Sequence, residues 1–272
     1  MNQTSLWRVA KIVDCSRAMM LAAVTLLLLN LHAGSQAEEV DTGDGGAIPQ
    51  VNSSARADDD RPDKPVHTED WQRWFPGEQC WFDLKKKIVI VDGQICQREA
   101  LLEMFACPAR TKDHESIVSV NCRAATIHAY LLAVGAQSGS PVRYEPKYAA
   151  ASGTEIEIFV YWTDENGKSH SRKAQELVRH FKTGETLQHP WVFAGSEIWQ
   201  DEDGQEHYLA ESGDLICVSN FRTATLDVPV KSSQANEELL YEPFTERIPP
   251  RDTKVRLVLR PCQTDACNED ER

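Results

Sequence analysis

The stretch CPARTKDHESIVSV, residues 107–120, gathers residue types that often do chemistry. Cys107, the triplet Asp113-His114-Glu115 and Ser116 fall within ten positions. Cysteine and histidine could bind a tetrahedral zinc ion, and a cysteine or serine could act as a nucleophile with histidine as its base. The competing interpretation is a polar turn that leads into a strand. Because adjacent residues of a strand point to opposite faces, the triplet cannot converge on one ion.

A zinc site would use Cys107, His114 and Cys122, which are separated by six and by seven residues. This spacing matches none of the compact zinc knuckles. Zinc is therefore the one cofactor that the sequence leaves open, and no other cofactor is predicted.

The candidates for catalysis overlap with this set. They are His114, Glu115 and Cys107, to which the fold could add Cys217, His207 and Asp214. Cys107 directly precedes Pro108 without the glycine-rich elbow that exposes a nucleophile, and Ser116 lacks a tight-turn context. The motifs HExxH and GxSxG and a glycine-rich phosphate loop are missing from the sequence. We therefore favour the polar turn over a catalytic site.

A second acidic cluster, DEDGQE at residues 201–206, resembles part of a calcium loop, because hard cations prefer clustered oxygens. The full twelve-residue pattern is absent, since a third acidic or amide ligand and the terminal glutamate are missing. A hairpin turn between SEIW and EHYLA explains the same residues, and we expect that turn here.

The N-terminus predicts export. Arg8, Lys11 and Arg17 form a positive region before the apolar run AMMLAAVTLLLLNL, and GSQA supplies small residues for cleavage after Ala37. The run is shorter than the roughly 18 to 20 residues that span a bilayer. Residues 1–37 are therefore expected to be a cleaved signal peptide. The mature protein is expected to be soluble, periplasmic or extracellular, and without a transmembrane segment.

Charge limits the partners. The formal charge of the whole chain is −13, and loss of three basic residues and one acidic residue with the signal peptide leaves −15. Nucleic-acid binding depends on Lys and Arg that neutralise phosphates, so no nucleic-acid partner is expected. An envelope or extracellular partner of unknown identity is expected instead.

Three segments follow the signal peptide. Residues 38–66 lack aromatic residues and are rich in Asp, Gly, Ser and Pro, which predicts a disordered acidic leader. Residues 67–261 are expected to form the globular domain, and residues 262–272 a flexible polar tail. The seven cysteines of the mature chain leave at least one thiol free or paired between chains. The disulfide candidates are Cys262 with Cys267 and Cys80 with Cys96.

The globular segment predicts an α+β fold in one compact domain, with mostly short antiparallel strands and two or three short helices. Apolar patterns predict strands at 88–91, 116–122 and 156–162, and further short strands over 191–261. Asp92-Gly93 predicts a hairpin turn. Helices are predicted over 98–108, 123–135 and 174–181. His128 lies on the apolar face of the second of these and is expected in the core.

Five aromatic residues, Trp71, Trp74, Phe75, Trp81 and Phe82, open the domain within twelve positions. Such a cluster can form a platform for a carbohydrate or another ligand. More often it seals the edge of a core, and we favour that second interpretation.

Several longer stretches point to a family. They are LLEMFACPARTKDHESIVSV, HAYLLAVGAQSGSPVRY, HPWVFAGSEIW with HYLAESGDLICVSNFRTATLDVPV, and TERIPPRDTKVRLVLRP. Together they resemble the YdjY-domain proteins common in planctomycete bacteria, from about Cys80 to Pro261. The resemblance implies an exported protein and brings no catalytic residues with it. Its stretches include Cys107, His114, Glu115, Cys217, Asn220 and Phe221.

The leading hypothesis is a non-enzymatic exported domain that serves as a binding or structural module of the cell envelope. One alternative is a zinc-assisted hydrolase, or another metal-site protein, that uses the region of Cys107, His114 and Glu115, because bound zinc would generate a nucleophile. A second alternative is a thiol-redox protein that uses the odd cysteine.

Overall fold

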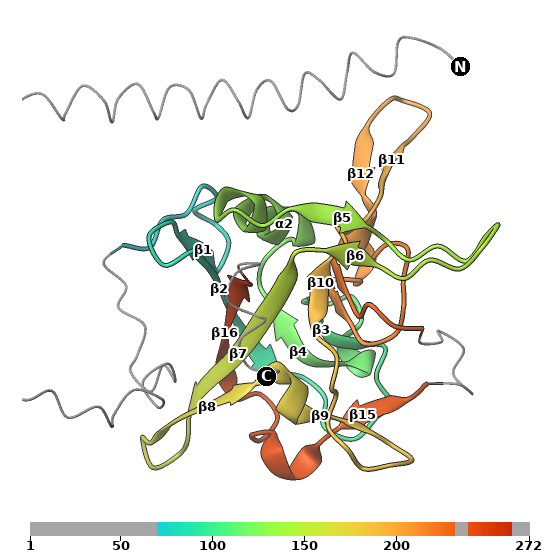
Figure 1. Cartoon of the computed structure of the whole chain (residues 1–272). Coiled ribbons are helices and arrows are strands. Elements are labelled where there is room, and N and C mark those ends of the chain that lie inside the picture. Colours follow the sequence, from blue (N-terminus) through green and yellow to red (C-terminus); the bar gives the residue numbers. More distant parts are fainter. Residues whose placement is uncertain (1–69, 232–238, 263–272) are drawn as a thin grey trace, which may run out of the picture. The chain divides into compact units, whose positions relative to one another are not determined.

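Three long strands carry the fold: β2 (Ile88–Ile95), β7 (Glu155–Thr163) and β16 (Lys254–Pro261). Along β7, every second residue from Ile156 to Val160 is buried, while the residues between them are partly exposed. This period of two places one face of the strand on a core. The computed structural model describes residues 70–231 and 239–262 (Figure 1), and the elements below all belong to these residues.

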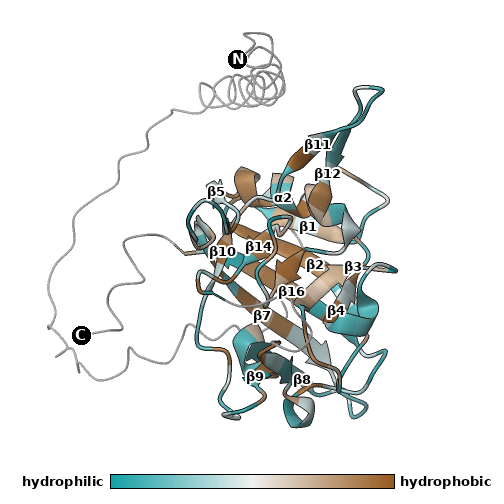
Figure 2. Cartoon of the chain, turned by 90° about the vertical axis from the view of Figure 1, so that its right-hand side faces the viewer, coloured by the Kyte–Doolittle hydropathy of each residue, from teal (hydrophilic) through white to brown (hydrophobic). Residues whose placement is uncertain are grey.

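Eight strands close into a mixed β-barrel, in the order β2-β16-β7-β10-β14-β13-β3-β4 and back to β2. The other barrel strands are β3 (Met104–Pro108), β4 (Ser116–Val120), β10 (Trp191–Phe193), β13 (Ile216–Cys217) and β14 (Leu226–Asp227). Neighbouring strands are antiparallel except for the pairs β3–β4 and β13–β14, which are parallel. Figure 2 shows the apolar residues gathered on these strands, around the barrel core.

The two parallel pairs have short connections: residues 109–115 join β3 to β4, and residues 218–225 join β13 to β14. Parallel neighbours usually need a connection of a dozen residues or more. Because these connections are so short, each one must return directly from the end of its strand to the level where the next, parallel strand begins. β3 and β13 are antiparallel neighbours, and their two connections meet where Lys112 lies against Phe221.

Two strands extend the sheet beyond the barrel. β1 (Cys80–Asp83) pairs with the first half of β2, on the same edge that pairs further along with β4. β8 (Ser169–Lys173) pairs with β7 and has no second neighbour among the described strands. The strands β1, β2, β16, β7 and β8 thus form one five-stranded antiparallel sheet (Figure 1).

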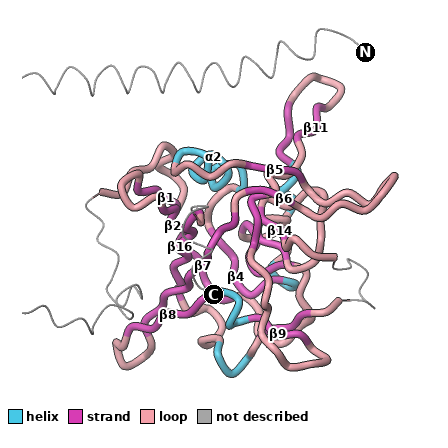
Figure 3. Tube along the Cα trace, viewed as in Figure 1, coloured by secondary structure: helices cyan, strands magenta, loops and turns pink. Residues whose placement is uncertain are grey.

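One α-helix, α2 (Ala124–Ala133), is present among the described residues, and it lies at the top of the barrel in Figures 1 and 3. Ile127, Tyr130 and Leu131 are buried with the barrel core. Gly135 has a φ of 98°, which suits the end of a helix. Three ladders of two strands complete the β-structure: β5 (Ser138–Ser140) with β6 (Ser152–Gly153), β9 (Val178–His180) with β15 (Tyr241–Pro243), and β11 (Ile198–Gln200) with β12 (Glu206–Tyr208). Short 3-10 turns lie at Asp113–Glu115, Ala174–Leu177, Leu209–Ser212 and Thr245–Arg247.

The prediction of mostly short strands in a single domain is confirmed, and so is the helix over 123–135. The α+β class is corrected to a mostly-β mixed barrel with one α-helix among the described residues. The helix predicted over 98–108 is wrong, because Met104–Pro108 is barrel strand β3. All five residues of β3 are buried between two neighbouring strands, so they show no alternation.

Two further local predictions are wrong for reasons of long-range pairing. Residues 174–181 form a 3-10 turn and strand β9, which pairs with the distant β15. Asp92-Gly93 is not a turn, because β2 continues through both residues. The glycine is needed for close strand approach: a Cβ on Gly93 would lie 2.5 Å from the backbone oxygen of Ser119 on β4.

Several predictions lie outside the described residues, namely the signal peptide 1–37, the leader 38–66 and nearly all of the tail 262–272, with Cys267. Within the part of the chain that the structure describes, no helix has the length and apolar character to cross a membrane.

Candidate functional site

The structure separates the three residues considered for zinc. Cys107 is buried in β3, where burial raises the pKa of its thiol. The side chain of His114 is 73% exposed, and its Nε2 lies 3.5 Å from Glu115. The Sγ of Cys122 lies 3.1 Å from Oε2 of Glu78. Over residues 70–231 and 239–262, no three potential metal ligands come together, so the zinc set is not assembled.

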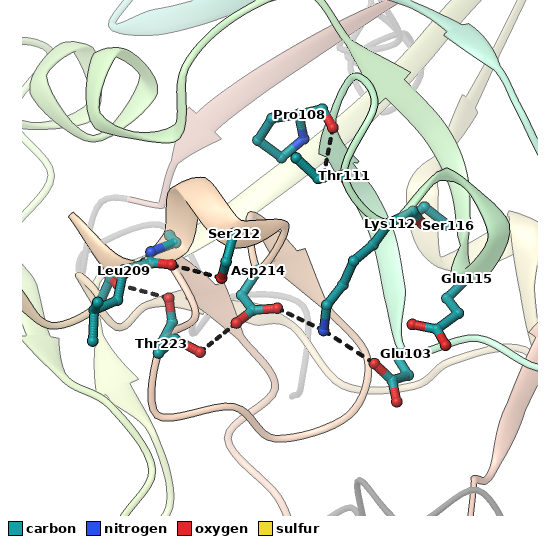
Figure 4. A network of polar contacts seen from close by, with 12 residues as sticks. Glu103, Pro108, Thr111, Lys112, Glu115, Ser116, Leu209, Ser212, Asp214 and Thr223 are labelled. Atoms are coloured by element: carbon teal, nitrogen blue, oxygen red, sulfur yellow. Dashed lines mark hydrogen bonds and ion pairs between the residues drawn. The ribbon is translucent and has the colours of Figure 1, made fainter. Parts of the chain in front are cut away.

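Three of the other candidates do gather, around a residue that the sequence did not indicate. Figure 4 shows Lys112 between two carboxylates, with its Nζ 3.0 Å from Asp214 and 3.2 Å from Glu103. Glu115 lies beside Glu103, and burial together with this neighbour raises the pKa of Glu103. Cys217 lies close enough to Asp214 and Lys112 for their charges to affect the pKa of its thiol. Thr223 donates a short hydrogen bond to Asp214.

This network joins the two connections of the parallel pairs and does not supply a reactive group. Burial acts to lower the pKa of Lys112, but its bonds to Asp214 and Glu103 outweigh burial and raise the pKa. A lysine that stays protonated is neither a nucleophile nor a base. Cys217 is completely buried, and burial raises the pKa of its thiol, which disfavours the reactive thiolate. We regard the network as a structural clamp.

The acidic cluster at 201–206 is the turn of the hairpin β11–β12, as predicted. Oδ2 of Asp201 lies 2.7 Å from Nε2 of His207, and Oδ1 accepts a hydrogen bond from the backbone of Gln205. Both carboxylate oxygens therefore serve the hairpin. His207 is held there, away from the network around Lys112.

His128 is a satisfied, largely buried residue, as expected. Its Nδ1 lies 2.8 Å from the hydroxyl of Tyr208, which in turn lies 3.0 Å from Oγ1 of Thr225. Burial lowers the pKa of His128 to about 4, so the ring is neutral at physiological pH.

The predicted Cys80–Cys96 disulfide is not formed. Cys80 stands opposite Val91 of β2, whereas Cys96 follows the far end of that strand, roughly 16 Å away at 3.3 Å per residue. The thiol of Cys80 instead lies near that of Cys122 and raises its pKa. Cys80, Cys96, Cys107, Cys122 and Cys217 form no disulfide in the structure.

A groove of about 1080 Å³ crosses the five-stranded sheet and is the strongest candidate for a binding site. Its centre is a row of side chains from four adjacent strands, set by the register: Asp92 on β2, Arg256 on β16, Tyr161 on β7 and Ser171 on β8. Further lining residues are Arg73, Gln79, Trp81, Asn121, Trp162, Asp164, Glu165, His170 and Lys254. A smaller hollow of about 470 Å³ near Phe244 and Arg247 has only one aromatic residue in its lining.

The floor of the groove is held rigidly. Arg256 donates two hydrogen bonds to the carboxylate of Asp92, at 2.6 and 2.9 Å. The guanidinium of Arg256 lies 4.8 Å from the centre of the Trp71 ring. Trp71, Trp81 and Tyr161 pack on Ile90 and its buried neighbours on the outer side of the sheet.

The two ends of the groove are also ordered. At one end, on the inward face of the sheet where Trp162 packs against the barrel core, the ring of His170 stacks on Trp162 with centroids 5.3 Å apart, and its Nε2 lies 2.8 Å from Asp164. The hydrogen bond to His170 lowers the pKa of Asp164. At the other end, the backbone N–H of Gln79 donates to the carbonyl of Asn121 at 3.1 Å, where β1 meets the end of β4.

The N-terminal aromatic cluster has two parts. Trp74 packs edge-on against Phe82 and Tyr130, at centroid distances of 4.9 and 5.4 Å, and the tilted rings of Phe82 and Tyr130 lie 4.7 Å apart. These rings help to cover the end of the core, as favoured. Trp71 and Trp81 lie on the opposite side of β1, at the groove. The sequence signal for the groove was the set of polar and aromatic residues that alternate with buried ones along β2, β7 and β16, but only the register aligns them.

These features define a mixed β-barrel domain with an aromatic groove on an extended outer sheet. The family model of the YdjY domain matches residues 80–260. The chain therefore belongs to the YdjY domain family, as its sequence motifs indicated. A search of curated proteins found no match, and a search of solved structures found none either. Arg73, which lines the groove, and Trp71, which packs on Arg256, precede the matched residues.

Proposed function

We propose that this protein is an exported, non-enzymatic binding module that holds a neutral, hydroxyl-rich ligand, such as a glycan, in the groove. The observation that carries this proposal is the row Asp92–Arg256–Tyr161, flanked by Trp81. It combines aromatic surface with paired hydrogen-bonding groups on a rigid sheet.

The chemistry of the row suits a sugar. The C–H face of a pyranose ring is apolar and packs on an aromatic ring, and Tyr and Trp offer both apolar area and a polar tip. The hydroxyls at the edge of the ring need planar donors and acceptors. Arg256 and Asp92 present these side by side, and small-molecule sites typically combine apolar walls with a few polar groups of this kind.

Charge favours a neutral ligand. The lining contains three basic residues and three acidic residues, which balance formally: Arg73, Lys254 and Arg256 against Asp92, Asp164 and Glu165. The whole chain is strongly acidic, at −13. A polyanion would approach against that charge without a basic surface to receive it.

Preorganisation also supports binding. The bidentate pair and the packing of Trp71 and Trp81 fix the side chains before a ligand arrives. Less conformational entropy is then lost on binding.

Export rests on the N-terminal pattern of charged, apolar and small residues. An envelope location would bring the groove to extracellular glycans. N-terminal sequencing of the protein from the periplasmic or culture fraction should begin at Glu38. An intact N-terminus in the cytoplasmic fraction would contradict export without affecting the groove.

The binding proposal is tested with the purified mature chain, by calorimetry and co-sedimentation against neutral and acidic polysaccharides. We expect binding to at least one neutral polysaccharide, and a loss of tenfold or more in affinity for Trp81→Ala and for Tyr161→Ala, because truncated aromatic contacts often cost more than about 1.4 kcal/mol. Trp199→Ala is the control, since Trp199 is 54% exposed on β11, outside the groove lining. Unchanged affinity in both groove variants, or binding to none of the neutral polysaccharides, would refute the proposal.

A further inference from the structure

The ends of β1 and β4 meet on one edge of β2. Cys80 stands opposite Val91 of β2, and Val120 stands opposite Gly93, two residues further along the same edge. Between them, Gln79 is hydrogen-bonded to Asn121 through its backbone, at 3.1 Å, and through its side chain, at 3.4 Å. These bonds hold the two chain ends in register.

Two cysteines flank this junction and face the same side of it. Cys80 and Cys122 are both buried, at 0% and 5% exposure, in the core cluster that includes Tyr130. Their thiols lie near each other, and the proximity of Cys80 raises the pKa of Cys122. Small changes in side-chain torsion are enough to convert such a contact into a disulfide, provided that the backbone already holds the two residues close together.

Cys96, Cys107 and Cys217 lack such a neighbour. Cys96 and Cys107 lie on opposite sides of β4, since β2 and β3 are its two neighbours. Two strand spacings amount to roughly 9.5 Å, more than the roughly 7 Å between Cα atoms that a disulfide allows. Cys217 packs with Met104, Ala224 and Phe221, without a cysteine in that cluster.

We propose that Cys80 and Cys122 are the disulfide pair of this domain, and that Cys96, Cys107 and Cys217 remain thiols. The bond forms by exchange with a disulfide-bonded oxidant, R–S–S–R, such as oxidised glutathione or a protein disulfide. One S–S bond of the oxidant breaks and one forms between Cys80 and Cys122. The two thiols lose two electrons and two protons, and the oxidant leaves as two R–SH molecules.

This bond would fasten the start of the domain to the end of β4. It closes the chain between Cys80 and Cys122 into a loop and so restricts the unfolded state. It also fixes Gln79 and Asn121, which line one end of the groove. The inference itself does not depend on the proposed ligand.

The test is disulfide mapping of the full chain, refolded in a buffer of oxidised and reduced glutathione. Free thiols are blocked with iodoacetamide under denaturing conditions, and the protein is digested with trypsin without reduction. Cleavage after Lys85, Arg98 and Arg110 separates Cys80, Cys96, Cys107 and Cys122 into different peptides. Among Cys80, Cys96, Cys107, Cys122 and Cys217 we expect one linked pair, Cys80–Cys122, and alkylated thiols at the other three. Alkylation of both Cys80 and Cys122, or a link from either to another cysteine, would overturn the proposal.

Thermal unfolding with and without reductant gives a second readout. Reduction should lower the Tm of the oxidised wild type by about 5–10 °C. The double variant Cys80→Ser/Cys122→Ser should show no response to reductant. The matched control Cys96→Ser/Cys107→Ser should respond like the wild type. A response that is lost in the control and kept in the first variant would contradict the assignment.

Discussion

Asp227 is an ionisable residue with no exposed surface. Its Oδ1 accepts hydrogen bonds from Asn220 and from the backbone of Val228, at 3.2 and 2.8 Å. Its Oδ2 has no hydrogen-bond partner within the described residues. Burial outweighs these bonds and raises the pKa of Asp227 to about 7. The carboxyl is therefore protonated in the folded state at mildly acidic pH, where the unfolded chain would already be ionised.

This difference predicts a pH dependence of stability. Between pH 4 and pH 7 the folded state binds more protons at Asp227 than the unfolded state, so Asp227 lowers the free energy of unfolding by about 1.4 kcal/mol per pH unit as the pH rises. Asp227→Asn removes this dependence and should gain stability relative to the wild type from pH 4 to pH 7, as measured by urea unfolding. Asp203→Asn removes an exposed carboxylate from the β11–β12 turn and serves as the control. Parallel curves for Asp227→Asn and wild type would contradict the assignment.

Lys112 is the second residue with a clear expected effect. Its side chain is 24% exposed, and it is paired with two carboxylates that are less exposed still. Lys112→Met keeps the length of the side chain but leaves Glu103 and Asp214 without their cation, so we expect a loss of about 2–3 kcal/mol in the free energy of unfolding. Lys85→Met removes the exposed pair with Asp70 and should leave that free energy nearly unchanged in the same urea titration. Equal effects of the two variants would show that the network is not a clamp.

Residue types alone did not predict the network around Lys112. The triplet Asp113-His114-Glu115 attracted attention through its composition, yet its neighbour Lys112 makes the central contacts. The reason is physical: a lysine is usually solvated, and nothing in a single sequence shows that two distant carboxylates, Glu103 and Asp214, lie beside it. His128 was predicted correctly because its helix carries a periodic apolar face.

At the scale of elements, β2 is the strand on which most depends. It pairs with β16 along one edge and shares its other edge between β1 and β4. At Gly93, β4 approaches so closely that a Cβ built there would lie 2.5 Å from the backbone oxygen of Ser119. Such an approach is open only to glycine.

Gly93→Ala should therefore destabilise the domain. The added methyl group forces β2 and β4 apart, and we expect a loss of about 1–3 kcal/mol in the free energy of unfolding. Gly77→Ala is the matched control, because a Cβ at Gly77 would meet no atom within 4 Å. Thermal or urea unfolding of the two variants measures this difference. A Gly93→Ala variant as stable as the Gly77→Ala control would show that β2 and β4 can move apart at no cost.

Predictions of elements succeeded where the pattern was local. β7 alternates cleanly and α2 repeats every three or four residues, so both could be identified from the sequence. The helices predicted over 98–108 and 174–181 were wrong because pairing with distant strands overrode the local spacing of apolar residues. The hairpin turn predicted at Asp92-Gly93 was wrong because a glycine suits a close contact between strands as well as it suits a turn.

At the scale of the whole molecule, the groove could not be predicted because it depends on register. Asp92, Arg256, Tyr161 and Ser171 come from four segments and align only when β2, β16, β7 and β8 pair as observed. A ligand-binding platform was one interpretation of the aromatic stretch at residues 71–82. The structure divides that stretch between the core and the groove, so each interpretation describes one part of it.

The closed barrel leaves its main sheet with two outer strands, β1 and β8. On β1, Gln72 exchanges two backbone hydrogen bonds with Phe82 and occupies that rim. On β8, the sequence SHSRK sets charge and hydroxyl groups along the rim instead of apolar side chains. A rim of this kind discourages a second copy from adding its own strand. These two outer edges of the main sheet therefore offer little for a second copy to pair with, even where many copies are crowded together.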